Sequence, residues 1–481
     1  MNFKLRSLVA ATLAGSMLMG FGVNAMADST DDILNALIAK GVLTEEEGAL
    51  LQKGRTGEKE AAEKKKASAV TAKFKDGISW ESGDGENKMS VNGRVQLDYR
   101  NYNANGGTAA SANIADTFDV RRAYLGAKGT FNKYYDFEVT ADFAQAVGST
   151  PAGYTPLDVA YMNIHWWDQA QFQFGQFKMP FSLEERTSSR FVDFQERSFV
   201  NNTSLTPGKE RGAMLHGTPI KGVNYAIAFS TGQGKNTNDA DQREDSKDII
   251  LHADANLAEL MGYKESVIHL GASYANGDLP PAAVGAQRTE GRGIEFFKPA
   301  AFTSTLNTME RTRYGLESVL AYGPVKFQGE YSEAKFEGTK SAGTDFNRSL
   351  DAYYVEALWL VTGENYADAY KKGKFDRIKP KNDFNPDFKG GLGAIELGAR
   401  YSKFDGSDFT TTNTAGTGVL ATGTNTNKAD AWTLALKWLP TANSRIMLTY
   451  VNTDFNTPVV AATGVTVNSE KTVMMRAQYD F

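Results

Sequence analysis

Most of the chain alternates apolar and polar residues in segments of about ten, from about residue 88 to the C-terminus. Between residues 135 and 143, for example, Tyr135, Phe137 and Val139 share one face of an extended chain. Asp136 and Glu138 share the other face. A period of two predicts β-strands whose two faces lie in different environments. A soluble β-sandwich alternates in the same way, so the choice of fold depends on further features.

Sixteen segments show this pattern and are predicted to be strands. They cover residues 88–102, 118–131, 135–144, 157–166, 170–178, 211–218, 223–231, 247–256, 267–276, 311–323, 325–336, 350–361, 393–404, 430–439, 444–454 and 471–481. All thirteen prolines lie outside these ranges, as the hydrogen bonding of a strand ladder requires. The even number is typical of bacterial single-chain membrane barrels.

Three features favour a membrane barrel over a soluble sandwich. Many segments begin or end in aromatic residues such as Trp166, Trp167 and Trp438, as the interface girdles of membrane barrels do. Short connections follow the even-numbered segments and long ones follow the odd-numbered segments. The final Phe481 resembles the C-terminal signature of bacterial outer-membrane barrels. The prediction is an all-β fold, a sixteen-stranded antiparallel transmembrane β-barrel over residues 88–481, wide enough for an aqueous lumen.

Two places depart from the regular pattern. The connection over residues 362–392 follows an even-numbered segment and yet is long, so it is either a folded periplasmic turn or a region with an uncounted hairpin. In the second segment, Phe118 and Val120 do not share a face with Ala123. A β-bulge near Arg121-Arg122 would resolve this conflict, because a bulge inserts one extra residue into a strand.

The N-terminus indicates the compartment. Lys4 and Arg6, an apolar run over residues 8–23 and a small-x-small site at residues 25–27 are typical of a secretory signal peptide, predicted over residues 1–27. An uncleaved anchor is the alternative. Export combined with a membrane barrel predicts the outer membrane of a Gram-negative cell, with outer-membrane lipid around the barrel.

Residues 28–73 are predicted to form a short helical extension with a charged linker, on the periplasmic side where an even-stranded barrel begins. Ile33, Leu34 and Leu37 fall at helical spacing, and Thr44 with Glu47 forms a capping box. The apolar stripe is too short to form a core alone, so it either self-associates or docks elsewhere. A partly disordered spacer is the open alternative.

Composition excludes several classes of function. The formal net charge of −5 argues against a nucleic-acid partner. The chain has no cysteine, which removes disulfides, thiolate metal sites and cysteine nucleophiles. No pair among the four histidines has metal-ligand spacing, and no phosphate-binding loop motif is present. We therefore expect no catalytic residues, no cofactor and no metal site.

The connection that follows the fifth segment, residues 175–217, is long, aromatic and charged. It carries six cations and five anions, together with apolar residues such as Phe181 and Phe191 that could anchor it. A barrel of this width leaks unless a segment folds inward, and this connection is the candidate. A surface loop is the alternative.

At this point the sequence resembles the phosphate-selective porin O/P family of Gram-negative outer-membrane porins. The residues that carry the resemblance are FDVRRAYLGAKGTF (118–131), YDFEVTADFA (135–144), GQFKMPFSLEERTSSRF (175–191), LVTGE (360–364) and GAIELGARYSKFD (393–405). The resemblance implies a trimeric sixteen-stranded porin. It also implies inward-folded loops and a ladder of arginines and lysines that guides anions to a constriction.

The resemblance also assigns candidate pore residues. Arg121, Arg122 and Tyr124 look like the family's paired arginines and neighbouring aromatic residue, Ser188 and Ser189 like its constriction-loop serines, and Asp158 like its pore aspartate. Three further loop cations complete the candidate set: Lys178, Arg186 and Arg190. One position departs from the family, since Glu185 stands where strongly anion-selective members would carry a lysine. The neighbouring Arg186 is expected to replace the missing positive charge.

The expected function is a water-filled, moderately anion-selective channel, because rings of Arg or Lys select anions in pores. Arg121, Arg122, Lys178, Arg186 and Arg190 are expected to converge at the narrowest point, opposed by Asp158, Glu184 and Glu185. The resemblance implies inorganic anions, namely phosphate or polyphosphate, as solute and a homotrimer as assembly. A general-diffusion or weakly cation-selective porin and a non-conducting structural barrel are the alternatives.

Overall fold

The structure is a computed structural model that describes residues 29–73, 77–105, 114–144, 156–201, 205–232, 234–236, 247–279, 284–299, 306–340, 345–387, 389–409, 426–462 and 465–481. The signal peptide predicted over residues 1–27 lies outside the described residues. The chain divides into two compact units. One is helical and runs up to Val70, together with Ser82–Asp84, and the other holds residues 71–81 and 85–481.

The helical unit contains two helices, α2 (Ser29–Ala39) and α3 (Glu45–Ser68). The capping box at the start of α3 is confirmed, because the Thr44 amide donates to Glu47 Oε2 at 3.0 Å and the Glu47 amide donates to Thr44 Oγ1 at 3.2 Å. The charged tract that the sequence predicts as a linker forms the second half of α3. No helix among the described residues has the length and apolar character needed to cross a bilayer.

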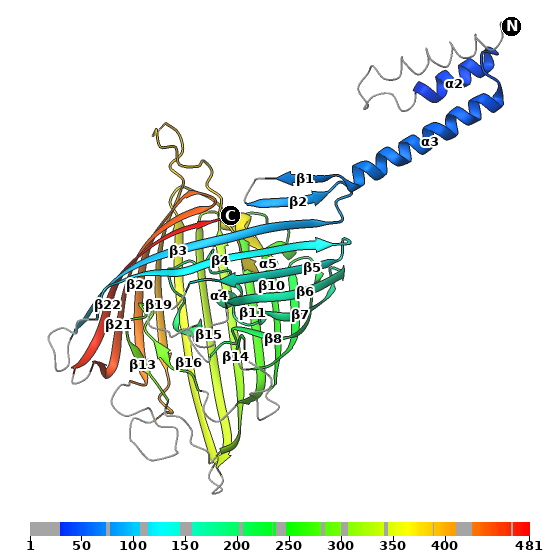
Figure 1. Ribbon diagram of the computed structural model, residues 1–481. Coiled ribbons are helices and arrows are strands. Elements are labelled where there is room, and N and C mark those ends of the chain that lie inside the picture. Colours follow the sequence, from blue (N-terminus) through cyan, green and yellow to red (C-terminus); the bar gives the residue numbers. More distant parts are fainter. Residues whose placement is uncertain are drawn as a thin grey trace. The chain divides into compact units, whose positions relative to one another are not determined.

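Sixteen antiparallel strands form one closed barrel, as predicted (Figure 1). In chain order they are β3 (Lys88–Asn105), β4 (Thr117–Phe131), β5 (Tyr135–Asp142), β6 (Leu157–Trp167), β7 (Ala170–Lys178), β8 (Lys209–Ile220), β9 (Val223–Ser230), β10 (Asp248–Asn256), β11 (Ser266–Leu279), β14 (Leu306–Tyr322), β15 (Val325–Lys340), β16 (Asp345–Leu360), β19 (Ala394–Asp405), β20 (Lys428–Thr441), β21 (Ser444–Ala462) and β22 (Val465–Asp480). Each strand pairs with the next, and β22 pairs with β3 to close the barrel.

Two further strands, β1 (Val70–Lys73) and β2 (Ile78–Ser82), extend the same sheet outside the barrel. The strand β2 pairs with the start of β3, with Ile78 opposite Val91. The sequence reasoning did not predict these strands, because they are short and lie beyond the regular alternation.

Most of the strands are longer than predicted, and three of these contain a proline. Pro219, Pro440 and Pro458 lie within β8, β20 and β21. The prediction that prolines avoid the strands is therefore wrong for these extended ends. Each of the three lies where the pairing register shifts, so the missing N–H falls at an interruption of the ladder.

The alternation places apolar residues outside and charged residues inside. In β14, Arg313 and Glu317 are buried toward the lumen, whereas Leu316 and Leu320 are exposed on the outer face. The bulge in β4 is confirmed, because Gln96 opposes Arg122 and the next residue of β3, Leu97, opposes Val120, which leaves Arg121 as the extra residue. This insertion restores the parity of the strand and places two consecutive arginines on the lumen side.

Connections fill part of the lumen. Phe199, in the one-turn helix η1 (Phe199–Asn201), packs on Phe296 of β13 (Glu295–Phe297), which forms a two-stranded sheet with β12 (Gln287–Arg288). The long connection after β16 is folded. It contains α6 (Tyr366–Ala369) and a small hairpin of β17 (Tyr370–Lys371) and β18 (Lys374–Phe375) that is separate from the barrel sheet.

Candidate functional site

The connection after β7 folds into the lumen, which confirms the predicted inward loop. Arg190 donates to Asn92 of β3 at 2.7 Å, and its carbonyl accepts from Gln478 of β22 at 3.1 Å. On the opposite part of the wall, Glu184 pairs with Arg400 of β19 at 3.2 Å. We call residues 179–208 the constriction loop.

The loop is shaped locally by a one-turn helix, α4 (Leu183–Arg186). Ser182 caps this helix, since its hydroxyl accepts from the Glu185 amide at 3.2 Å. Ser182 has a φ of 61°, in the left-handed region, which turns the chain sharply after β7. At the start of the helix, the Leu183 and Glu184 amides donate to the carboxylate of Glu330 on β15 at 3.0 and 2.7 Å.

The charged residues of α4 point to three different partners. Glu184 accepts hydrogen bonds from Ser198 and Asn201, both at 2.7 Å, and burial raises its pKa. Glu185 pairs with Arg197 at 3.0 Å and with Lys178 at 3.7 Å. Burial opposes ionisation of Glu185, but these cations outweigh it and lower the pKa.

Arg186, the third charged residue, reaches the barrel wall. It bonds to Asp254 of β10 at 3.3 Å and to Glu317 of β14. The positive charge of Arg186 is therefore compensated by ion pairs with these two carboxylates. The sequence-based expectation that Arg186 replaces the charge missing at Glu185 is not what the structure shows.

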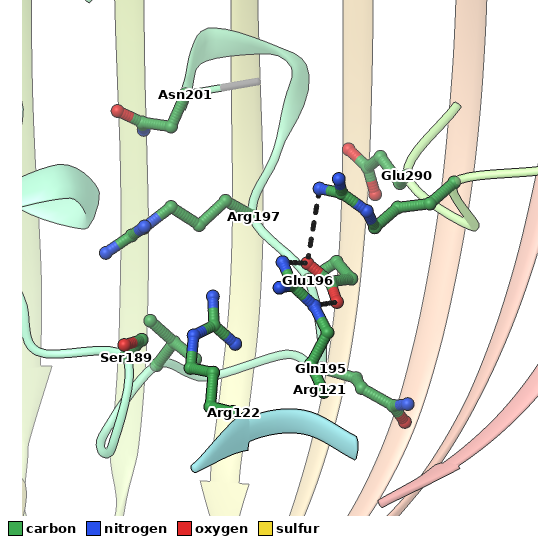
Figure 2. Close-up of a pocket in the computed structure, with 10 residues that line it drawn as sticks. Arg121, Arg122, Ser189, Gln195, Glu196, Arg197, Asn201 and Glu290 are labelled. Atoms are coloured by element: carbon green, nitrogen blue, oxygen red, sulfur yellow. Dashed lines mark hydrogen bonds and ion pairs between the residues drawn. The ribbon is translucent and has the colours of Figure 1, made fainter. Parts of the chain in front are cut away.

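Glu196 of the constriction loop lies at the centre of a group of four arginines, and sequence reasoning did not predict this role. It pairs with Arg100 at 2.7 Å, Arg121 at 2.9 Å, Arg476 at 3.1 Å and Arg292 at 3.8 Å. Figure 2 shows the carboxylate of Glu196 beside Arg121. Burial raises the pKa of the Glu196 carboxyl, but the surrounding arginines hold it well below its usual range. The sequence shows only that the loop carries an acid here, because three of the four arginines come from distant strands.

Arg121 and Arg122 border a small cavity of about 60 Å3 between β4 and the two inserted connections (Figure 2). Arg121 is held by Glu196, as described above, whereas Arg122 donates to the amide oxygen of Gln96 at 2.9 Å. Ser189 also lines this cavity.

The other predicted residues line a second, larger cavity of about 560 Å3, which we call the main cavity. Seven of the nine candidates border it: Tyr124, Asp158, Lys178, Arg186, Ser188, Ser189 and Arg190. Among the residues that the structure describes, Ser189 alone borders both cavities. The expected convergence of all five candidate cations on one point is therefore not observed, because the constriction loop separates the arginine pair of β4 from the loop cations.

The acids expected to oppose these cations are also arranged differently. Glu184 and Glu185 are turned into their own ion pairs and do not border the main cavity. Asp158 borders it but binds Lys209 and Lys235, the latter at 3.0 Å. Tyr124 carries the Arg94 guanidinium over its ring at 4.3 Å, in a cation–π contact.

The described lining of the main cavity is strongly cationic. Three carboxylates face it: Glu138, Asp158 and Asp254. Eight cationic side chains face it: Arg94, Lys128, Lys178, Arg186, Arg190, Lys209, Lys372 and Lys374. Lys372 and Lys374 come from the hairpin β17–β18, and no periodic signal in that connection showed that it enters the lumen.

A closed sixteen-stranded barrel with a charged lumen and an inward-folded loop defines an outer-membrane porin, a channel protein. The sequence model "Phosphate-selective porin O and P" matches residues 89–481, and the chain belongs to this family. Its fold and family are those of channels rather than enzymes.

The chain is also similar to a sequence relative and to solved porin and channel structures. Porin O of Pseudomonas aeruginosa is 26% identical over 399 residues, which cover 79% of this chain and 86% of that protein. Among solved structures, an anion-selective porin from Comamonas acidovorans has a TM-score of 0.51 at 14% identity, over 82% of this chain and 100% of that one. The outer-membrane channel DcaP of Acinetobacter baumannii has a TM-score of 0.49 at 11% identity, over 83% and 99%.

Proposed function

We propose that this porin is a moderately anion-selective channel whose physiological solute is phosphate. The observation that carries the proposal is the lining of the main cavity, in which cationic side chains outnumber carboxylates by eight to three among the described residues. The net negative charge of the whole chain does not oppose this, because exposed charges are screened beyond about 8–10 Å at physiological salt. Selectivity depends on the charges that lie near the permeating ion.

Two arginines are available to an oxyanion in this arrangement. Arg190 is held by the side-chain amide of Asn92 and Arg122 by that of Gln96, so neutral partners fix both guanidinium groups. A guanidinium held by a neutral partner keeps its full charge for bidentate hydrogen bonds to phosphate. Ser188 and Ser189 would add hydroxyl donors from the loop side of the main cavity.

Glu185 stands where strongly anion-selective family members would carry a lysine, and this difference is compatible with anion preference. Its carboxylate is turned toward Arg197 and Lys178, so its charge is compensated inside the protein. The same pairing weakens Lys178 as an anion site, which is why we propose moderate rather than strict selectivity. The description of the family as phosphate-selective supports phosphate as the solute.

Reversal potentials in asymmetric KCl test the proposal. The wild type is expected to favour chloride over potassium, with phosphate blocking the chloride current. Arg190→Gln should reduce the anion-to-cation permeability ratio several-fold and weaken the phosphate block, because it removes a charge of the main cavity whose hydrogen-bond partner, Asn92, is neutral. Arg288→Gln is the matched control, since Arg288 is half exposed and pairs with Glu295. A wild-type channel that favours potassium, or no conductance at all, would refute the proposal.

We also propose that the chain assembles as a homotrimer and that residues 28–73 lie in the periplasm as an appendage. The family resemblance supports the trimer, and the separate helical unit supports an appendage. Deleting residues 29–68 is expected to leave single-channel conductance unchanged, because these residues belong to a compact unit of their own. Light scattering of the detergent-solubilised protein would show whether the trimer survives. Failure of the barrel to insert would show that the segment is required for folding.

A further inference from the structure

The barrel wall beside the constriction loop holds a cluster of imidazoles and carboxylates that anion conduction does not need. His252 and Asp254 lie on β10, His269 on β11 and Glu317 on β14, three neighbouring strands (Figure 1). All four side chains are buried. The wall therefore concentrates metal-ligand chemistry at one place.

We propose that His252, Asp254 and Glu317 form a binding site for a divalent transition-metal ion such as Zn2+. One potential ligand atom from each of the three lies within 4.8 Å of the others. His252 Nε2 is 2.9 Å from Asp254 Oδ2 and 3.7 Å from Glu317 Oε1. Zinc–ligand bonds of about 2.0–2.2 Å bring ligand atoms to within about 4 Å of one another, so these spacings need little adjustment.

The hydrogen bonds behind the ligands are those that orient metal-binding side chains. His252 turns Nε2 toward the carboxylates while its Nδ1 lies 2.9 Å from the Ser273 hydroxyl. Asp254 accepts from the Asn224 amide at 2.7 Å through its other oxygen. Outer partners of this kind fix the ring orientation and the tautomer of a metal-binding histidine.

Glu317 is positioned from two sides. His269 Nε2 lies 2.9 Å from Glu317 Oε1, and its Nδ1 lies 2.7 Å from the Tyr370 hydroxyl. Gly271 separates Asp254 from Glu317 in the strand register. A Cβ at Gly271 would come within 2.5 Å of Glu317 Oε1, so only glycine leaves room for this carboxylate to lie over the neighbouring strand.

Charge and access also fit a cation. Asp254 and Glu317 supply two carboxylates, and a single arginine of the constriction loop, Arg186, pairs with both. His252, Asp254 and Arg186 all line the main cavity, which provides an entry path. Because Arg186 bonds to the same two carboxylates, a bound metal would displace it and release its charge into the cavity. Metal binding is therefore coupled to the contact between the constriction loop and the barrel wall.

The test measures Zn2+ binding to the full-length, detergent-solubilised protein by competition with a chromophoric chelator. The wild type is expected to bind one Zn2+ per chain. His252→Ala and Glu317→Gln should each weaken binding at least tenfold, whereas His216→Ala should not. His216 is the matched control because it lines the same cavity but bonds to an amide, Asn163, at 3.0 Å.

A variant that binds Zn2+ more tightly than the wild type cannot be explained by misfolding. Arg186→Gln should bind Zn2+ more tightly than the wild type, because the competing guanidinium is gone. In planar bilayers, Zn2+ should shift the wild-type reversal potential in the direction of higher anion selectivity. The reversal potential of His252→Ala should not change. The chelator assay does not depend on ion selectivity, so it separates this inference from the proposed function. Equal Zn2+ affinity in the wild type and His252→Ala would overturn the site and leave a structural ion-pair network.

Discussion

Arg400→Met is expected to displace the constriction loop from the barrel wall and to raise single-channel conductance and current noise. Arg400 is buried and joins two connections to the barrel wall. It pairs with Glu184 at 3.2 Å and with Glu290 at 2.6 Å, donates to the Glu196 carbonyl at 3.0 Å and stacks over the Phe194 ring at 4.6 Å. Methionine fills similar space but leaves two buried carboxylates without their shared cation.

The expected cost is about 3–5 kcal/mol, the range for removal of one partner from a buried ion pair. Since about 1.4 kcal/mol changes a population tenfold, the fraction of channels with a displaced loop should rise by at least a hundredfold. Arg288→Met is the matched control. Arg288 lies in the same connection as Glu290 but is half exposed, and an exposed pair contributes about 0–1 kcal/mol.

Single-channel recording would give the conductance and noise, and electrophoresis with and without heating would show that the barrel has folded. A folded Arg400→Met barrel with wild-type conductance and noise would mean that other contacts hold the loop.

Reversing three lumen charges together, Arg190→Glu, Lys372→Glu and Lys374→Glu, is expected to convert the channel from anion to cation preference. All three side chains face the main cavity. The triple variant leaves five cationic side chains and six carboxylates there among the described residues. A unit charge 4 Å from an ion contributes about 1 kcal/mol even in bulk water, so the combined change amounts to several kcal/mol.

The sign of the reversal potential in a KCl gradient measures this change. Lys371→Glu is the control, because Lys371 belongs to the same hairpin but is exposed and does not line the main cavity. It should keep the wild-type sign. A triple variant that still prefers chloride would show that the ion path bypasses the main cavity.

Local pattern was sufficient to predict the strands, whereas the choice of a membrane barrel also used the aromatic ends of the segments, the lengths of the connections and the final Phe481. The period of two follows from backbone geometry, so the alternation gave the strand number and the face of each residue without knowledge of any partner. The bulge at Arg121 was predicted because an inserted residue shifts the parity of one strand. The capping box at Thr44 and Glu47 was predicted because the two residues bond within one helical turn.

The site itself was decided by the tertiary structure. Glu184, Glu185 and Arg186 are consecutive in the sequence, yet each pairs with a different part of the interior. Lys374 enters the main cavity from a connection without periodicity, and the cluster of His252 and its neighbours forms only when three strands pair. Ion pairs and metal ligands depend on distance in space between residues that are up to hundreds of positions apart. A local pattern therefore showed which side chains face the lumen, and only the closed barrel with its inserted loop determined which of them meet.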